Sequence, residues 1–287
     1  MARSWPRWTS TTRSAPTPES DRREKKTIMT APLRLESKDG IATITLTQPD
    51  RLNALSLGML DALVEALDEV RRGDDRVLVL AATGRAFCAG ADRAEMIERK
   101  PAEWEPIVDH YLDPVRRIAD LDIPVIARLQ GDTVGGGFGL AIACDFRVAA
   151  RDIRLGAPFV QIGLAGCDMS AGYYLPRLIP LGAATEMMMT GKLVRADEAL
   201  ALGLVHRVVE PEGLDATVAE LAGQLRAGPP IALAFTKRAI RRSLDLDRDA
   251  EFDYEVFAQV NCIQTEDHQE GVRAFFDEKR APVFEGR

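Results

Sequence analysis

Two glycine-rich segments, each just behind an apolar run, constrain the fold of this 287-residue chain more than any other feature. The first spans Gly84–Asp92 and follows the run Val77–Ala81, while the second spans Gly131–Gly139 and follows Ile123–Leu129. Short apolar runs of this kind are typical of strands that are buried on both faces. Small residues behind a buried strand let the chain turn sharply and let another segment or a ligand approach the backbone closely.

The rest of the chain predicts strands that alternate with helices. Leu33–Glu36 and Ile41–Leu46 flank Asp39 and Gly40 as a hairpin requires, and Ser56 is placed to cap a helix that ends at Arg72 before Gly73. A helix over Gly136–Cys144 and a strand over Phe146–Ala149 follow the second glycine segment. Such alternation indicates βαβ units and a mainly parallel sheet, so the fold class is α/β. From Asp168 onward the pattern is mostly helical, interrupted by one strand at Val205–Val209.

The chain divides into three parts by composition. Residues 1–30 are rich in Arg, Ser, Thr and Pro and offer few apolar residues to bury, which predicts a disordered N-terminal extension. Either Met1 or Met29 is the natural start, so residues 1–28 are either part of the protein or an upstream addition. Residues 31–210 form the predicted α/β core, and residues 211–287 form the predicted helical C-terminal region.

The overall composition limits the partners and the location. A net charge of -7 argues against nucleic acid as the main partner, because binding phosphates requires a basic face. No apolar run reaches the length that crosses a bilayer, so no membrane partner is expected. The four cysteines are far apart, without a CxxC pair or metal-ligand spacing. This pattern predicts free thiols, no metal site and a cytoplasmic location.

The glycine segments can bind an anion through the backbone. At a junction between a strand and a helix, unpaired N–H groups and the positive end of the helix dipole can point at a ligand. Two converging N–H groups would form an oxyanion hole for a carbonyl oxygen that gains negative charge. The segments do not match a P-loop, and Leu140 stands where a dinucleotide fingerprint has its third glycine. The alternative is that these glycines only make tight turns or close helix contacts.

Together the two segments resemble the enoyl-CoA hydratase/isomerase (crotonase) family, and the resemblance extends over nearly the whole chain from about Leu33. It implies a crotonase-type core of repeated ββα units with a helical C-terminal region. By the same resemblance Ala91 and Gly136 would donate the two oxyanion-hole hydrogen bonds to the carbonyl of an acyl-CoA thioester. The further substrate-binding residues that it implies are Ala89, Gly90, Asp92, Arg93, Gly137, Phe159 and Lys279.

The resemblance also implies partners. The small-molecule partner would be an acyl-CoA of the kind found in fatty acid metabolism, with coenzyme A as part of the substrate and no separate cofactor. A homotrimer or a hexamer is expected. Arg93 and Lys279 suit the phosphates of coenzyme A by their charge, although ordinary solvated cations would look the same in the sequence.

The chain departs from the family where a hydratase carries its two glutamates. One glutamate falls three residues after the oxyanion-hole glycine, where this chain has Gly139, and the other falls at or near Phe159. Neither residue can transfer a proton, and hydration needs a general base and a general acid at one water molecule. Asp168 is the remaining acid, near the point where dienoyl-CoA isomerases, a 4-chlorobenzoyl-CoA dehalogenase and naphthoate synthases carry a functional aspartate. The alternative is that Asp168 simply caps a helix that begins at Met169.

Three functions remain open from the sequence. The first is an enoyl-CoA lyase or isomerase in which Asp168, or a bound water, replaces the glutamates. The second is a dehalogenase- or hydrolase-like enzyme in which Asp168 attacks the acyl group. The third is a protein that binds CoA thioesters with little catalysis. His110 is a weaker candidate for the acyl pocket, because an isolated histidine is more often structural than catalytic.

Overall fold

The computed structural model describes residues 26–30, 32–96 and 99–287. The strands are β1 Lys26–Thr30, β2 Leu33–Lys38, β3 Ile41–Leu46, β4 Val77–Ala82, β5 Ala86–Cys88, β6 Val125–Leu129, β7 Asp132–Val134, β8 Phe146–Ala150, β9 Arg154–Gly156, β10 Val194–Arg195 and β11 Arg207–Val209. The α-helices are α1 Leu57–Arg72, α2 Pro101–Asp120, α3 Gly136–Ala143, α4 Ala171–Leu178, α5 Leu181–Thr190, α6 Ala196–Ala201, α7 Leu214–Arg226, α8 Pro230–Arg242, α9 Arg248–Ile263 and α10 Glu266–Val272.

The strands form two sheets, and successive strands of the core alternate between them. The large sheet has the order β1-β2-β3-β4-β6-β8-β11 and the small one has the order β10-β9-β7-β5. The chain passes from β4 to β5, from β6 to β7 and from β8 to β9, and each of these steps leaves the large sheet for the small one. From β3 to β11 all neighbours in the large sheet are parallel, whereas β1, β2 and β3 pair antiparallel. The predicted α/β fold of repeated ββα units is confirmed.

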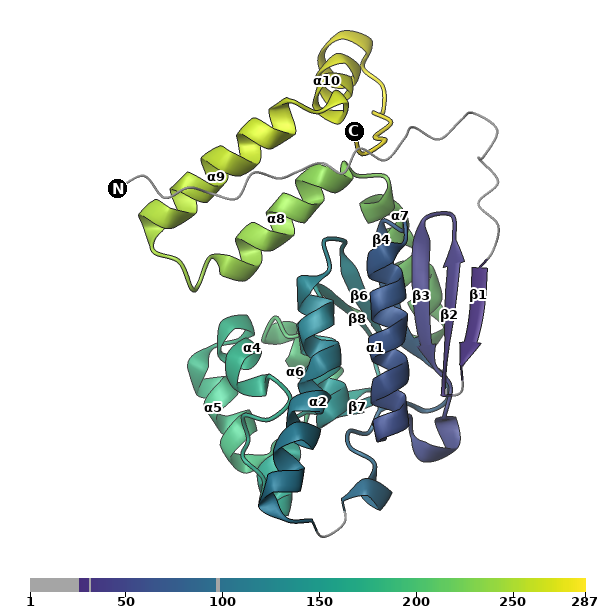
Figure 1. Cartoon of the computed structure of the whole chain (residues 1–287), viewed down its shortest axis with the longest axis vertical. Coiled ribbons are helices and arrows are strands. Elements are labelled where there is room, and N and C mark those ends of the chain that lie inside the picture. Colours follow the sequence, from purple (N-terminus) through teal and green to yellow (C-terminus); the bar gives the residue numbers. More distant parts are fainter. Residues whose placement is uncertain (1–25, 31, 97–98) are drawn as a thin grey trace.

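The core lies where helices cover the large sheet. Figure 1 shows α1 and α2 side by side in front of this sheet, and α7 packs against β4, β6 and β8. All six residues of β4 are buried, as its continuous apolar sequence predicts for a strand covered on both faces. Ser56 caps α1 as predicted, since its Oγ accepts the Met59 N–H at 3.2 Å. The hairpin of β2 and β3 also forms around Asp39 and Gly40.

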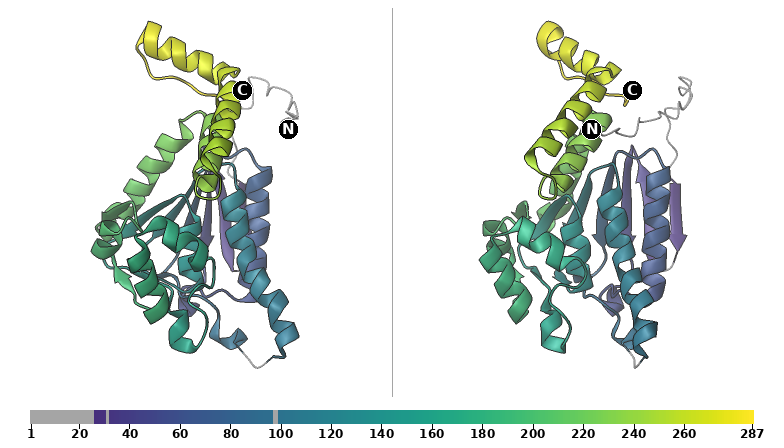
Figure 2. Two further views of the ribbon diagram at one scale, coloured as in Figure 1. Left: turned by 90° about the vertical axis from the view of Figure 1, so that its left-hand side faces the viewer. Right: turned by 60° about the vertical axis from the view of Figure 1, so that its left-hand side comes forward.

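The C-terminal helices extend beyond the two sheets. Figure 1 shows α8 between α9 and the body of the molecule, and in both views of Figure 2 the yellow α10 stands away from the sheets. A π-helical turn over Arg273–Glu278 continues α10. A helical C-terminal region is therefore present as predicted, although α9 makes its main contacts with α8 and α10.

The predicted N-terminal extension falls mostly outside the described residues. Residues 1–25 lie there, so their predicted disorder stays a prediction. Lys26–Thr30, which belong to the predicted extension, instead form β1 and pair residue by residue with β2 from Lys26↔Ser37 to Thr30↔Leu33. Within the described residues, regular structure therefore begins at Lys26, where β1 adds to the edge of β2. No helix in the described part of the chain is long and apolar enough to span a membrane.

Candidate active site

The first glycine segment ends in a short parallel bridge that leaves one N–H group unpaired. After β5 the chain turns at Gly90, which has φ +92°, and Ala91 then pairs with Leu55. The Leu55 N–H donates to the Gly90 carbonyl at 2.7 Å, and the Asp92 N–H donates to the Leu55 carbonyl at 3.1 Å. Successive N–H groups of extended chain point to opposite sides. The Ala91 N–H therefore points away from Leu55, and among the described residues it has no backbone acceptor.

The second glycine segment starts a helix at the same place. Gly135 has φ 58° and is the N-cap of α3, and its own N–H donates to the Gly156 carbonyl at 2.9 Å. Gly136 is the first helical residue, so its N–H has no partner within α3. It also finds no backbone acceptor elsewhere in the part of the chain that the structure describes. The positive end of the helix dipole adds to its attraction for negative charge.

The two glycine segments are in close backbone contact at Gly90 and Gly136. A Cβ atom added to Gly90 would lie 3.1 Å from the Gly136 nitrogen and 3.1 Å from the Val134 carbonyl oxygen. A side chain at position 90 would therefore separate the segments. Because Gly90 immediately precedes Ala91, this contact places the Ala91 and Gly136 N–H groups on neighbouring stretches of backbone. Two such donors can bind an oxygen atom that gains negative charge.

The residues around Ala91 have structural partners of their own. Asp92 is buried, forms an ion pair with Arg51, and accepts the Ala94 N–H at 2.9 Å. Its carboxylate is thus already used in stabilising the loop that follows Ala91. Ala89 is exposed and donates its N–H to the Leu52 carbonyl at 3.1 Å. Arg93 is exposed, as a contact with a ligand's phosphates would require.

Gly137 and Phe159 pack against the two glycine segments. A Cβ atom on Gly137 would lie 2.3 Å from the Cys88 carbonyl oxygen, so only glycine allows α3 to approach β5 this closely. Phe159 is buried within the 3-10 turn Pro158–Ile162, and its ring lies 3.6 Å from the Cβ position of Gly135. Phe159, at or near which the resemblance places the second glutamate, therefore forms an apolar wall next to the unpaired N–H groups.

Gly139, where the resemblance places the first glutamate, is closely covered by Met169. A Cβ atom there would lie 2.4 Å from the Met169 carbonyl oxygen and 2.6 Å from its Cβ atom. Met169 and the next residue, Ser170, both have positive φ, at 48° and 65°. Non-glycine residues adopt this conformation at a cost of about 1–3 kcal/mol each, and such strain is concentrated at functional sites. The turn Met169–Ser170 thus occupies the volume that a glutamate side chain would need.

Asp168 directly precedes this strained turn and is not a helix cap. The expectation that a helix begins at Met169 is wrong, since α4 begins at Ala171 with Ser170 as its N-cap. The positive φ values of Met169 and Ser170 are incompatible with helix and delay its start. The half-buried Asp168 carboxylate accepts the Met169 N–H at 2.7 Å. It stabilises the turn, and its remaining oxygen has acceptor capacity for a ligand or water.

One residue of this site was missed in the sequence. Tyr111 on α2 donates its hydroxyl to the Leu55 carbonyl at 3.0 Å. Burial and, to a lesser extent, the nearby carboxylates of Glu95, Asp92 and Asp168 together raise the pKa of this phenol to about 12.

His110, the neighbour of Tyr111 on α2, was the weaker sequence candidate for the acyl pocket. His110 instead pairs with Asp61 and Asp113, at 3.0 Å each. The helix therefore turns Tyr111 toward the site and His110 away from it. An aromatic residue beside a polar one on an amphipathic helix was the only signal in the sequence, and it does not tell which of the two faces inward.

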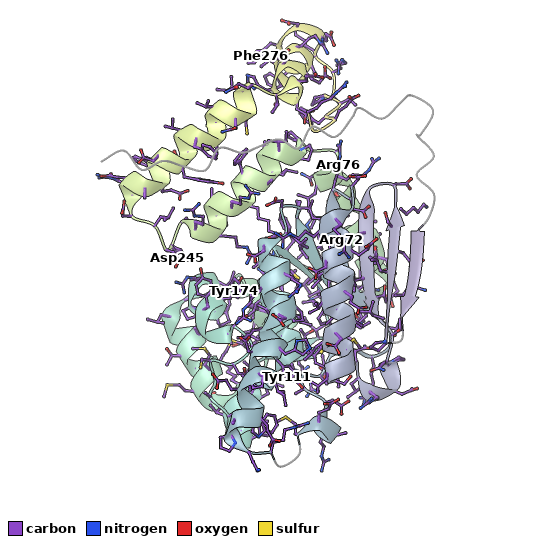
Figure 3. All side chains as sticks on the ribbon, in the orientation of Figure 1. Arg72, Arg76, Tyr111, Tyr174, Asp245 and Phe276 are labelled. Atoms are coloured by element: carbon purple, nitrogen blue, oxygen red, sulfur yellow. The ribbon has the colours of Figure 1, made fainter. Side chains whose placement is uncertain are left out.

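Lys279 does not join these residues within one chain. It is exposed at the end of the π-helical turn, three residues after Phe276. Figure 3 labels Phe276 and Tyr111 near opposite ends of the molecule. A contact of Lys279 with a ligand at the glycine segments stays a prediction that calls for a second copy of the chain.

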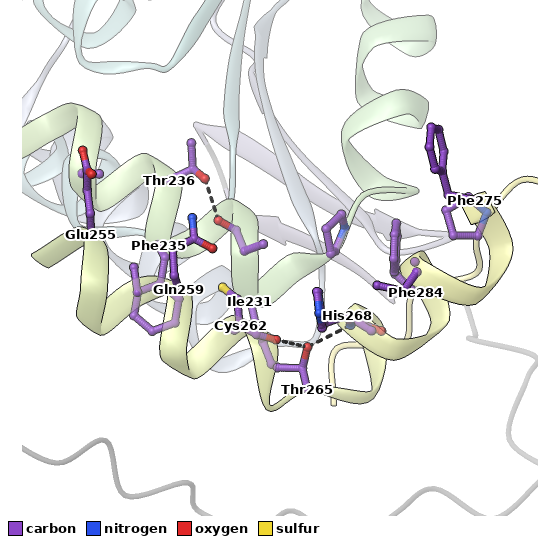
Figure 4. A pocket seen from close by; sticks show the side chains of 18 of the residues that line it. Ile231, Phe235, Thr236, Glu255, Gln259, Cys262, Thr265, His268, Phe275 and Phe284 are labelled. Atoms are coloured by element: carbon purple, nitrogen blue, oxygen red, sulfur yellow. Dashed lines mark hydrogen bonds between the residues drawn. The ribbon is translucent and has the colours of Figure 1, made fainter. Parts of the chain in front are cut away.

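The two described cavities lie elsewhere. One of about 650 Å³ lies among α8, α9 and α10, where Phe235, Phe275 and Phe284 are among its walls (Figure 4). The other, of about 470 Å³, lies between α4 and α8. Neither is lined by the residues that carry the unpaired N–H groups. Among the described residues, no group of three or more His, Cys, Asp or Glu side chains could hold a metal ion.

Known proteins resemble this chain over most of its length. Residues 36–287 match the model of the family described as enoyl-CoA hydratase/isomerase. The chain is 34% identical over 256 residues to a short-chain-enoyl-CoA hydratase of Clostridium acetobutylicum, covering 88% of this chain and 97% of the relative. It is also 34% identical over 260 residues to the 1,2-epoxyphenylacetyl-CoA isomerase of Escherichia coli, covering 86% and 96%.

A solved structure gives the same result. The enoyl-CoA hydratase of Mycobacterium smegmatis superposes with a TM-score of 0.84 at 36% identity, covering 88% of this chain and 98% of that one. The fold is therefore of the crotonase type. The chain belongs to the enoyl-CoA hydratase/isomerase family.

Proposed function

We propose that this protein is an enoyl-CoA isomerase-type enzyme that polarises the thioester carbonyl between the Ala91 and Gly136 N–H groups. The observation that carries the proposal is the pair of unpaired N–H groups held together by the contact of Gly90 with Gly136. A carbonyl oxygen bound there would accept negative charge as a proton leaves the α-carbon. Loss of one such donor is worth about 3 kcal/mol of transition-state stabilisation. The relatives named as acting on CoA thioesters support this class of substrate.

Asp168 is the proposed proton carrier. Hydration needs two groups at one water, and the resemblance places the two glutamates at Gly139 and at or near Phe159, residues that cannot transfer a proton. Migration of a double bond needs only one base that takes a proton from the α-carbon and returns it to the γ-carbon. In that sequence the carbon–hydrogen electron pair moves into a dienolate and the carboxylate becomes a carboxylic acid. The dienolate then takes the proton at the γ-carbon, which restores the carboxylate.

Turnover of two thioesters tests this proposal. Wild-type protein is incubated in D₂O with 3-hexenoyl-CoA and, separately, with crotonyl-CoA, and the products are identified by mass and by absorbance of the conjugated thioester. We expect 3-hexenoyl-CoA to become conjugated and crotonyl-CoA to gain no water. Asp168→Asn should slow the isomerisation at least about a hundredfold, the lower range for loss of a general base. The matched control is Asp152→Asn at an exposed position.

Other outcomes identify the alternatives. If crotonyl-CoA gains water in the wild type but not in Asp168→Asn, the enzyme is a hydratase in which Asp168 serves in place of the glutamates. A covalent acyl or aryl adduct on the protein after incubation with 4-chlorobenzoyl-CoA supports nucleophilic attack by Asp168 and a dehalogenase- or hydrolase-like function. Binding of acyl-CoA without any turnover supports a binding protein with little catalysis.

We also propose that the protein needs no cofactor besides the coenzyme A of its substrate, and that it assembles as a homotrimer or hexamer. Exposed apolar side chains on the C-terminal helices support an assembly, because a monomer rarely exposes so many on one region. These side chains are Phe252, Val256, Val260, Ile263, Phe275 and Phe276. In such an assembly Arg93 and a neighbouring copy's Lys279 would bind the phosphates. Four free cysteines support a reducing location, the cytoplasm.

A further inference from the structure

Leu55 is the residue that connects the two unpaired N–H groups. Its main chain pairs with the segment around Ala91, through one hydrogen bond from its N–H to the Gly90 carbonyl and one to its carbonyl from the Asp92 N–H. Its side chain reaches the other segment, since its Cδ1 atom lies 2.7 Å from the Cβ position of Gly136. Leu55 is fully buried. A shift of Leu55 would therefore move Ala91 relative to Gly136.

Tyr111 fixes Leu55 from a third element. The Leu55 carbonyl accepts both the Asp92 N–H at 3.1 Å and the Tyr111 hydroxyl at 3.0 Å. A carbonyl oxygen has two lone pairs, so these two bonds use it fully. The hydroxyl comes from α2, 56 positions along the chain from Leu55. Tyr111 thus ties the bridge to the helix that covers the large sheet.

The hydroxyl is suited to hold position and not to transfer a proton. It donates to a backbone carbonyl, which accepts the hydrogen bond but is too weak a base to take the proton. Burial raises the pKa of Tyr111 to about 12, so the phenol stays protonated throughout the neutral range. The donor is therefore present at every pH at which the enzyme would work.

We infer that Tyr111 is a positioning residue, whose hydroxyl holds the Leu55 bridge so that the Ala91 N–H stays aligned with the Gly136 N–H. The inference rests on the proposed function of these two groups as an oxyanion hole. If Tyr111 is lost, the enzyme should polarise the thioester carbonyl less strongly. Binding of the coenzyme A portion of a ligand does not depend on this alignment.

The test uses a thioester that cannot isomerise or add water. Butyryl-CoA labelled with carbon-13 at the thioester carbonyl is bound to wild-type protein, to Tyr111→Phe and to Tyr173→Phe, and the carbonyl stretch is measured by difference infrared spectroscopy. Exchange of the α-protons with D₂O is followed by mass in the same samples. Tyr173 is the matched control, since its hydroxyl is exposed and donates to Asp245. Thermal unfolding checks that each variant is folded.

We expect the bound carbonyl frequency to fall below its solution value in the wild type and in Tyr173→Phe. In Tyr111→Phe much of this fall should be lost and α-proton exchange should slow about tenfold, the effect of one ordinary hydrogen bond. The Kd for butyryl-CoA should stay within about twofold and the pH profile of exchange should keep its shape. The fold should survive, because the Leu55 carbonyl keeps the Asp92 N–H.

Two results overturn the inference alone, and a third overturns it together with the proposed function. Tyr111→Phe with a wild-type carbonyl frequency and exchange rate would show that the hydroxyl positions nothing. Loss of one limb of the pH profile would make Tyr111 a proton-transfer group. If the wild type itself binds butyryl-CoA without any fall in carbonyl frequency, the oxyanion hole fails, and the inference about Tyr111 fails with it.

Discussion

Replacing Gly139 by alanine tests how closely the Met169–Ser170 turn packs on α3. The added Cβ atom would lie 2.4 Å from the Met169 carbonyl oxygen and 2.6 Å from its Cβ atom, so the turn must move. Overpacking of this kind costs about 3 kcal/mol at its upper range. Alanine in place of glycine inside a helix returns about 1 kcal/mol. The net expectation is a loss of about 2 kcal/mol in the free energy of unfolding.

The assay combines urea unfolding with turnover of 3-hexenoyl-CoA. Gly223→Ala is the matched control, since Gly223 lies inside α7 and a Cβ atom there would meet nothing within 4 Å. It should stabilise the protein by about 1 kcal/mol without changing turnover. In Gly139→Ala turnover should fall about tenfold or more, because Asp168 moves with the turn. Gly139→Ala with unchanged stability and turnover would refute the close packing of the turn on α3.

Restoring the family glutamate extends this test. Gly139→Glu should not create hydratase activity with crotonyl-CoA, because the first atom of the new side chain already collides with Met169. Gain of water addition by this single change would show that the turn yields easily.

Two further changes probe ion pairs away from the site. Asp145→Asn leaves the buried Lys237 without its carboxylate at 2.8 Å and should cost about 3 kcal/mol in urea unfolding, whereas Asp197→Asn at an exposed pair should cost about 0.5 kcal/mol or less. A similar loss in both variants would contradict the role of burial. Arg280 lowers the pKa of Glu270 from 4.5 to about 2, so this pair's stabilisation is present above pH 4.5 and lost as the pH falls toward 2. Glu270→Gln should flatten the decline of Tm over that interval, and an unchanged decline would contradict the assignment.

The elements with local signals could be predicted from the sequence. The Ser56 cap and Gly73 gave the bounds of α1, and the apolar run from Val77 gave β4, because caps and periodicity depend only on neighbouring residues. The small sheet was not predicted. Its strands are only two or three residues long, as in β7 and β10, which is too short for any alternation to be read.

The sequence could predict only the part of the candidate site whose backbone conformation is set by the glycine segments themselves. Ala91 and Gly136 follow from the glycine segments, whose backbone conformation creates the unpaired N–H groups. Tyr111 could not be found in this way, because its partner Leu55 is distant in sequence and is contacted through its backbone. The start of α4 was misplaced because a strained turn has no sequence signature of its own at Met169.

The glycine at position 139 and the position of Asp168 are linked through the Met169–Ser170 turn. Gly139 lacks the side chain that would collide with Met169, so the Met169–Ser170 turn can close onto α3. Closing the turn puts both residues at positive φ, and the Asp168 carboxylate compensates part of that strain by accepting the Met169 N–H. Asp168, the proposed replacement for the glutamate, thus directly precedes the turn that fills the volume of the missing glutamate side chain. Under the proposed role of Asp168, this turn supplies a single carboxylate for proton transfer, which favours returning a proton to the substrate over adding water to it.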